Sequence, residues 1–171
     1  MVLNKINSIT NDFYSDEWYT HRHVVDHMYS FLNPRKGSTI LCPFDTDKSE
    51  FVKYAKDNGY KVIYNIRDFC SDKKYKCDYI ITNPPFSIKN EVIKKALEYK
   101  VRTCFILPID SITGVTRHEL FKEYNSYPYI YIPKRRISYI GSDMKPKKGN
   151  CFHSIYMILD NYTAPAIQFE S

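Results

Sequence analysis

"DYIITNPPFS", residues 78–87, joins a short apolar run to an amide, two prolines and an aromatic ring. The run at 78–82 is typical of a buried strand, and the prolines that follow prevent the strand from continuing. In open α/β sheets, ligands lie beyond the carboxyl ends of the strands, and Asn83-Pro84-Pro85-Phe86 falls at such an end. The stretch therefore predicts a buried strand and a functional loop directly after it.

The residues on both sides of this stretch alternate between strand and helix patterns. Short apolar runs predict strands at 38–44, 60–66, 78–82 and 103–108. Helical spacing of apolar residues predicts helices at 47–59, 88–100 and 116–124. The alternation predicts an α/β fold with a parallel sheet, because a helix must connect two neighbouring parallel strands.

The two ends of the chain depart from this alternation. Strands are predicted at 127–132, 136–140 and 153–159 without helices between them, which indicates a hairpin-like ending and an antiparallel strand added late. Near the N-terminus, residues 16–32 have the pattern of a helix that precedes the first strand, with Thr20 as its N-cap. We expect a single domain that spans residues 1–171.

Composition excludes several classes of protein. Twenty-five Lys and Arg residues against nineteen Asp and Glu give a net charge of +6, which suits an anionic partner but also serves solubility. The five cysteines are scattered, as in a protein of the reducing cytoplasm, and no signal peptide or membrane span is expected. No metal is expected, because His23 and His27 share a helix face without a third ligand.

The rigid loop after residue 82 offers acceptors to an amino group. Two prolines fix φ and remove two backbone donors, so the Asn83 side-chain oxygen and the Pro84 carbonyl meet few competing N–H groups. These two acceptors can hold both N–H bonds of an exocyclic base amine, and Phe86 can stack on a base that has left its helix. The structural alternative is a proline-braced turn with Asn as turn former.

"DYIITNPPFS" also resembles the (D/N/S)PP(Y/F) motif of amino-directed DNA methyltransferases, in the NPPF form that is typical of adenine enzymes. The order of the other segments is similar to that of the Dam-like adenine methyltransferases of phages and prophages. The segments compared are "DEWYT" (16–20), "FILP" (105–108), "RISYI" (136–140) and "HSIYMIL" (153–159). The resemblance spans roughly residues 12–160.

This resemblance implies S-adenosylmethionine as methyl donor and the adenine amino group in DNA as acceptor, with Asn83, Pro84, Pro85 and Phe86 as the catalytic residues. It also implies a Rossmann-like methyltransferase fold, mostly parallel, with an antiparallel strand near one edge. The segment between Ile66 and Asp78 is too short for a helix and a full strand, so the usual third strand is expected to be missing.

By the same resemblance, the cofactor-binding residues lie after the first two strands and in the N-terminal segment 12–32. They are Trp18, Tyr19, Thr20, Pro43, Phe44, Asp45, Asp68 and Phe69. Asp45 would meet the ammonium of the donor, and Asp68 and Phe69 its adenine. Two features depart from the family pattern: no glycine lies between Gly37 and Gly59, and Asn65 stands nearest to the place of the acidic residue that binds the ribose.

A basic loop at 134–150 is the candidate nucleic-acid contact, since its cations can neutralise phosphates and a tyrosine can stack on a base. Its candidate residues are Arg135, Arg136, Tyr139, Lys145, Lys147 and Lys148. A solvated hairpin is the alternative. No separate target-recognition domain is expected.

Two functional hypotheses follow. One is a DNA adenine methyltransferase, with RNA or another amine as a variant of its substrate. The other is a non-catalytic relative that keeps the fold and a DNA-binding face but has lost the cofactor through its glycine-free first loop. Such a protein would bind nucleic acid or inhibit a host defence system.

Overall fold

The computed structural model describes residues 19–140, 153–160 and 165–170. Its α-helices are α2 (Arg22–Leu32), α3 (Glu50–Asp57), α4 (Lys89–Tyr99) and α5 (Val115–Glu123). Its strands are β1 (Tyr19–Thr20), β2 (Thr39–Cys42), β3 (Lys61–Tyr64), β4 (Tyr79–Thr82), β5 (Arg102–Pro108), β6 (Tyr129–Ile132), β7 (Tyr139–Ile140), β8 (Ser154–Leu159) and β9 (Ile167–Phe169). Two short 3-10 helices, η1 (Phe86–Ile88) and η2 (Ile109–Ile112), follow β4 and β5.

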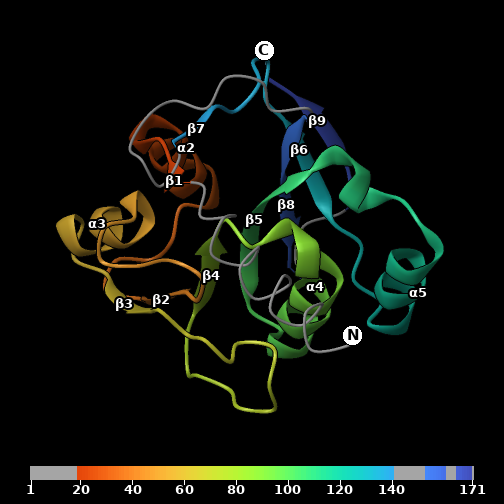
Figure 1. The fold of residues 1–171 in the computed structure, drawn as a ribbon, viewed down its shortest axis with the longest axis horizontal. Helices are drawn as coiled ribbons and strands as arrows, with labels where there is room; N and C mark the ends of the chain where they lie inside the picture. The colour runs from red at the N-terminus through yellow and green to blue at the C-terminus, as the bar shows by residue number, and fades with distance from the viewer. Residues whose placement is uncertain (1–18, 141–152, 161–164, 171) are drawn as a thin grey trace, which may run out of the picture.

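Seven of these strands form one sheet in the order β3-β2-β4-β5-β8-β6-β9 (Figure 1). The first four neighbours are parallel, as expected for strands joined by crossover helices. Strand β8 runs antiparallel to both β5 and β6, and β9 then pairs parallel with β6. The predicted α/β fold with a mostly parallel sheet and an antiparallel strand near one edge is confirmed.

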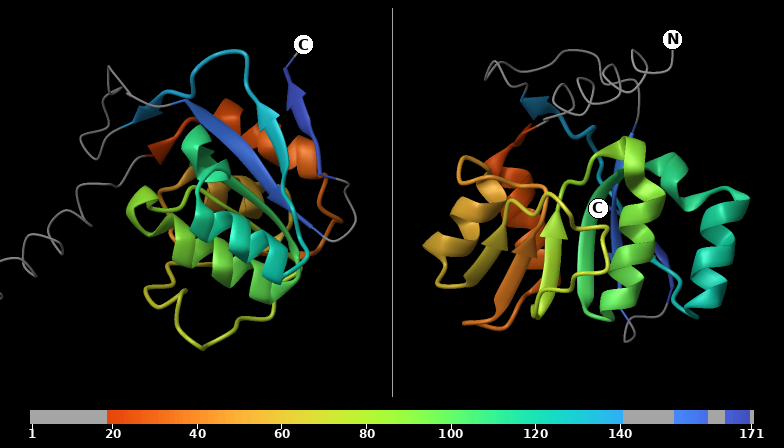
Figure 2. Two further views of the ribbon diagram at one scale, coloured as in Figure 1. Left: turned by 90° about the vertical axis from the view of Figure 1, so that its right-hand side faces the viewer. Right: turned by 60° about the horizontal axis from the view of Figure 1, so that its bottom comes forward.

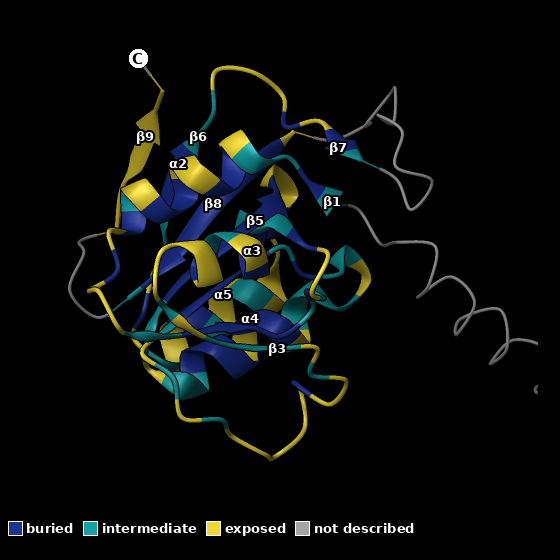
Figure 3. Ribbon diagram, turned by 90° about the vertical axis from the view of Figure 1, so that its left-hand side faces the viewer, coloured by how far each residue is buried: buried dark blue, intermediate teal, exposed yellow. Residues whose placement is uncertain are grey.

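Helices cover both faces of the sheet, with α2 and α3 on one side and α4 and α5 on the other (Figure 2). Successive strand residues point to opposite faces, so Ile40 packs with the first pair of helices and Leu41 with the second. The centre of the sheet is therefore apolar on both sides. Figure 3 shows β8 buried along its length, whereas β9 at the edge is exposed.

Two predictions about the ends of the chain were wrong. Thr20 does not cap α2: it belongs to β1, and the N-cap is His21, which makes no side-chain cap hydrogen bond. Within 136–140, Tyr139 and Ile140 form β7, which leaves the main sheet and pairs antiparallel with β1. Strand β6 therefore does not form a hairpin with the next strand along the chain. It pairs with β8.

The expected loss of the third strand agrees with the structure. The chain between β3 and β4 forms turns and no strand, and β3 is the edge of the sheet among the described residues. Strand β9 was not predicted from the sequence. It brings the sheet to seven strands, but it lies at the edge opposite to β3.

The described part of the chain contains no helix that is both long and apolar enough to cross a membrane. In the same residues, no three His, Cys, Asp or Glu side chains gather in a way that could hold a metal ion.

Candidate functional site

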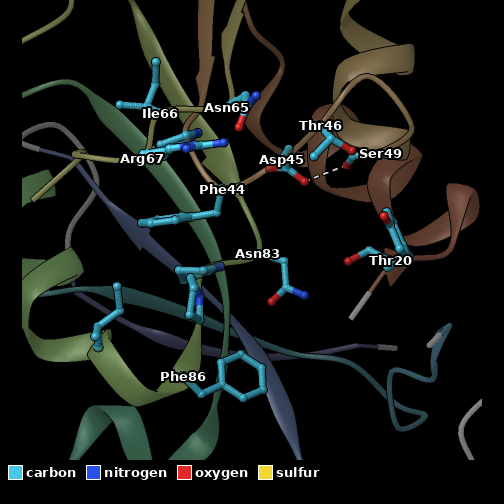
Figure 4. Close-up of a pocket in the computed structure, with 15 residues that line it drawn as sticks. Thr20, Phe44, Asp45, Thr46, Ser49, Asn65, Ile66, Arg67, Asn83 and Phe86 are labelled. Atoms are coloured by element: carbon cyan, nitrogen blue, oxygen red, sulfur yellow. Dashed lines mark hydrogen bonds between the residues drawn. The ribbon is translucent and has the colours of Figure 1, made fainter. Parts of the chain in front are cut away.

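A cavity of about 250 Å³ opens beyond the carboxyl ends of β2, β3 and β4 (Figure 4). This is the location at which open α/β sheets bind ligands. Its walls come from four segments: β1, the loop after β2, the loop after β3 and the NPPF loop after β4. The lining residues are Tyr19, Thr20, Pro43, Phe44, Asp45, Thr46, Ser49, Asn65, Ile66, Arg67, Asn83, Pro84, Pro85, Phe86 and Ile88.

Asp45 supplies a buried carboxylate on the loop after β2. One of its oxygens accepts a hydrogen bond from the Ser49 hydroxyl and the other from the Thr82 hydroxyl, each at 2.6 Å. Burial raises the pKa of Asp45 from 3.8 to about 7, although the two hydrogen bonds act in the opposite direction. Ser49 also caps α3 by accepting from the Phe51 N–H, so the carboxylate is held by both a helix start and a strand end.

The loop after β3 closes against the glycine-free loop after β2. The Asn65 N–H donates to the Asp45 carbonyl at 3.0 Å, and the Ile66 N–H donates to the Pro43 carbonyl at 2.7 Å. Asn65 has a left-handed backbone conformation, with a φ of 57°, and this conformation reverses the chain after β3. These contacts fix Asn65, Ile66 and the following Arg67 along one side of the cavity.

The NPPF loop forms the side that faces them in Figure 4. Pro84 is buried, and Asn83 and Phe86 are half-buried at the cavity. Phe86 begins η1 and meets Tyr139 of β7 edge to face, with ring centroids 6.4 Å apart. The catalytic residues predicted from the sequence, Asn83 to Phe86, thus line one cavity together with Asp45.

Strand β1 brings a hydroxyl to the remaining wall. Pairing of Thr20 with Tyr139 holds β1 beside β7, and both Tyr19 and Thr20 line the cavity. Thr20 is 4% exposed, and its Oγ1 has no hydrogen-bond partner among the described residues. A buried hydroxyl without a partner is costly, so a ligand that hydrogen-bonds to Thr20 in the cavity would be favoured.

This hydroxyl provides a direct test of ligand binding. We expect Thr20→Val to raise the free energy of unfolding of the unliganded protein by about 1 kcal/mol, since an unsatisfied hydroxyl is removed and the shape is kept. Affinity for the cavity ligand should fall, whereas Thr20→Ser, which keeps the hydroxyl, should retain it. Urea unfolding with and without ligand measures both effects. A less stable Val variant would mean that Thr20 already has a partner.

Several other predicted residues lie away from the cavity. Phe69 is 1% exposed in the core, where it packs against Phe44 and stacks on Tyr99. Asp68 is exposed, and its carboxylate accepts from the Tyr75 hydroxyl at 3.5 Å. Neither residue lines the cavity, so their expected contact with a bound adenine does not agree with this arrangement.

The nucleic-acid residues divide in a similar way. Tyr139 is 1% exposed and its hydroxyl is 2.7 Å from Ser154 Oγ, so the expected stacking of its ring on a base is corrected to a core role. Arg135 and Arg136 are exposed, and Arg136 lies 3.0 Å from a ring nitrogen of His153. Trp18, Lys145, Lys147 and Lys148 lie outside the described residues.

Six residues of the lining were not predicted as site residues from the sequence: Thr46, Ser49, Asn65, Ile66, Arg67 and Ile88. Each lies in the loop after a strand or at the start of the helix that follows it. The rule that places ligands at the carboxyl ends of strands could have found them. The sequence predicted Asn65 only as the residue nearest to the place of the family's acidic ribose ligand.

No protein-family model matches the chain. Among curated proteins, the type II methyltransferase M.EcoRI of Escherichia coli is 29% identical over 86 residues, which cover 43% of this chain and 26% of that protein. A modification subunit assigned to a type I restriction enzyme of Vibrio vulnificus superposes with a TM-score of 0.54 at 14% identity, covering 96% of this chain and 48% of that one. TrmN of Thermus thermophilus gives 0.51 at 13% identity, covering 81% and 48%.

These similarities establish the fold. The sheet has the architecture of the S-adenosylmethionine-dependent methyltransferases, as the sequence predicts. The chain spans about a quarter of the curated relative and about half of each of the two structures.

Proposed function

We propose that this protein transfers a methyl group from S-adenosylmethionine to the exocyclic amino group of adenine in DNA, as a member of the Dam-like group of phages and prophages. The observation that carries the proposal is the single cavity shared by Asn83, Pro84, Phe86, Asp45 and Thr20. The similarity to M.EcoRI, a type II methyltransferase, supports it. We also propose that the protein acts in the cytoplasm, where DNA is accessible.

S-adenosylmethionine is the expected cofactor, and the residues present fit it. It supplies a methyl group activated by attachment to a positively charged sulfur. The Asp45 carboxylate has room to accept a third hydrogen bond from the ammonium of the cofactor, because a carboxylate offers about four acceptor positions and two are in use. The unpartnered Thr20 hydroxyl adds a donor and acceptor on the neighbouring wall.

The NPPF loop then positions the amine. The Asn83 oxygen and the Pro84 carbonyl would accept from the two N–H bonds of the adenine amino group and direct its lone pair toward the cavity. Phe86 would carry the face of the flipped base, held in place by Tyr139 behind it. No residue needs to act as a strong base, since the amine can release its proton to solvent after transfer. The rate enhancement then comes chiefly from orientation.

The basic loop would hold the DNA backbone. Arg135 and Arg136 are exposed at its described start, a few residues before β7, whose Tyr139 contacts Phe86. The remaining cations of the loop continue from this point along the chain. Backbone contacts of this kind position the duplex without reading its sequence.

Replacing Lys145, Lys147 and Lys148 together by Ala should weaken DNA binding and make it less dependent on salt. Each lost phosphate contact lowers the slope of log affinity against log salt by about 0.9. A matched variant replaces Lys61, Lys94 and Lys122, which are exposed elsewhere and form no ion pair with a described residue. Titration of a fluorescent duplex at several salt concentrations measures the slopes. If the slopes of log affinity against log salt are equal in both variants, the loop is a solvated hairpin that does not contact DNA.

The proposed activity is tested by mass spectrometry of DNA from cells that express the protein, which should contain N6-methyladenine. Titration calorimetry with S-adenosylmethionine separates the enzyme from its non-catalytic alternative. Binding without methylated DNA would point to another amine acceptor. Absence of cofactor binding would favour a nucleic-acid-binding protein that has lost catalysis.

A further inference from the structure

Arg67 is a cation at the cavity that the proposed reaction does not use. It follows β3 by three residues, lines the cavity and is exposed to solvent. No described residue forms an ion pair or hydrogen bond with its guanidinium. In Figure 4 its side chain lies on the same side of the cavity as Ile66 and Asn65, across from Asn83 and Phe86. An uncompensated guanidinium at the wall of a cavity is a ready partner for an anion.

The position of Arg67 relates it to a particular part of a nucleoside. In Rossmann folds that bind dinucleotides, an acidic residue after the second strand binds the ribose hydroxyls, and an arginine nearby accommodates a 2′-phosphate instead. Here β3 is the second strand of the parallel series, and it ends at Tyr64 followed by Asn65. The neutral amide of Asn65 therefore occupies the place at which a carboxylate would repel a phosphate. The Arg67 guanidinium lies two residues later.

The remaining charges of the lining reinforce this reading. Asp45 is the single carboxylate among the described lining residues, and it is engaged by the Ser49 and Thr82 hydroxyls. Asp68 is adjacent to Arg67 in sequence but does not line the cavity, and its carboxylate accepts from Tyr75. Asp45 is thus the single described lining residue that would oppose a negative charge, and both of its oxygens already accept hydrogen bonds.

We propose that the Arg67 side of the cavity binds an adenosine that carries a phosphate on its ribose, at the 2′ or 3′ oxygen. Arg67 pairs with the phosphate, and Asn65 hydrogen-bonds to the free hydroxyl beside it. Backbone hydrogen bonds from Asn65 and Ile66 to the loop after β2 fix the main chain from which both side chains extend. S-adenosylmethionine has no ribose phosphate, so the inference concerns a second ligand class, which would compete with the cofactor for the Asn65 side of the cavity, and it does not depend on methyl transfer.

Calorimetry with the whole chain tests the proposal, with adenosine, adenosine 2′-phosphate and adenosine 3′-phosphate as the probes. For the wild type we expect at least one phosphate to bind about tenfold more tightly than adenosine, the gain of one charge-assisted hydrogen-bonded pair. Arg67→Ala should abolish the preference, and Arg67→Lys should keep part of it because the charge remains without the planar fork. Lys61→Ala, which removes an exposed cation of β3 that does not line the cavity, should leave it unchanged.

The outcomes are distinct from those of the proposed function. If the wild type binds both phosphates no more tightly than adenosine, or if Arg67→Ala keeps the preference, the inference is wrong, whether or not S-adenosylmethionine binds. If the phosphate preference is present and S-adenosylmethionine does not bind, the proposed cofactor is wrong and the inference stands. An oligonucleotide that ends in a 3′-phosphate, tested beside the free nucleotide, tells whether the phosphate comes from a strand end.

Discussion

Asn83→Ala is expected to lower the rate of methyl transfer by about 10² to 10³-fold, as removal of a single preorganised hydrogen-bonding group does in other active sites. The carboxamide lies on the NPPF wall of the cavity, opposite the residues that would hold the cofactor's nucleoside. Its oxygen would contact the amine that reacts and not the cofactor. The affinity for S-adenosylmethionine should therefore remain nearly the same, and the loss should appear in kcat.

A matched control comes from the other side of the same cavity. Asn65→Ala removes the same functional group from a lining position near Arg67, and it should raise the KM for the cofactor with little effect on kcat. Single-turnover transfer to a DNA duplex, with calorimetry for cofactor affinity, measures both variants. If Asn83→Ala retains activity, or if the two asparagines lose the same kinetic parameter, the amide has no special role in holding the amine.

The parts of the site that follow from strand ends could be predicted from sequence. The NPPF loop follows an apolar run that is typical of a buried strand, and the segment from Pro43 to Asp45 lies at the end of another. The predicted strand at 38–44 stops at Cys42, which places Pro43 and Phe44 in the loop, and both segments lie at the cavity. The proline pair makes the end of β4 particularly clear, because proline cannot continue a central strand. Position in the cavity is then a consequence of topology, without need for any knowledge of side-chain contacts.

Residues whose place depends on long-range packing could not be predicted in the same way. Tyr139 belongs to a segment that reads as another strand of the sheet, yet it pairs with β1, more than a hundred residues earlier in the chain. That pairing buries its ring and moves Thr20 from a presumed helix cap into the cavity wall. The Phe69 ring could equally contact a ligand or pack in the core, as judged from residue type. In the structure it packs against Phe44 and Tyr99 in the core.

Arg67 shows a different limit of sequence reasoning. It lies one position before the Asp-Phe pair that the resemblance singles out, so attention falls on its neighbours. The hydrogen bonds that tie Asn65 and Ile66 to the loop after β2 orient the chain so that Arg67 lines the cavity and Asp68 does not. Which of two adjacent side chains faces a ligand is set by backbone direction after a turn, and residue type alone does not reveal it.

Asp45→Asn should stabilise the protein at alkaline pH and impair cofactor binding. The pKa of Asp45 in the folded protein is about 7, against 3.8 for an ordinary aspartate. Between these values the folded protein keeps a proton that the unfolded chain releases, so stability falls as the pH rises. Above pH 7 the folded protein carries the whole cost of the buried charge, which a difference of about three pKa units sets at about 4 kcal/mol.

The Asn variant does not ionise, and its amide can accept from one of the two hydroxyls and donate to the other. Its stability advantage over the wild type should be about 3 kcal/mol smaller at pH 5 than at pH 8.5. Urea unfolding at the two pH values measures this difference. Asp47→Asn, at an exposed position on the same loop, is the matched control and should show no comparable change. A constant difference for Asp45→Asn would mean that its carboxyl titrates normally.

The same ionisation links stability to cofactor binding. An ammonium pairs with the ionised carboxylate, so the affinity of the wild type for S-adenosylmethionine should increase as the pH rises through about 7, the range in which the unliganded fold loses stability. Asp45→Asn should bind weakly at every pH, with no such increase. Calorimetry between pH 6 and 8.5 distinguishes the two profiles. A wild-type affinity that is flat over this range would exclude Asp45 as the partner of the ammonium.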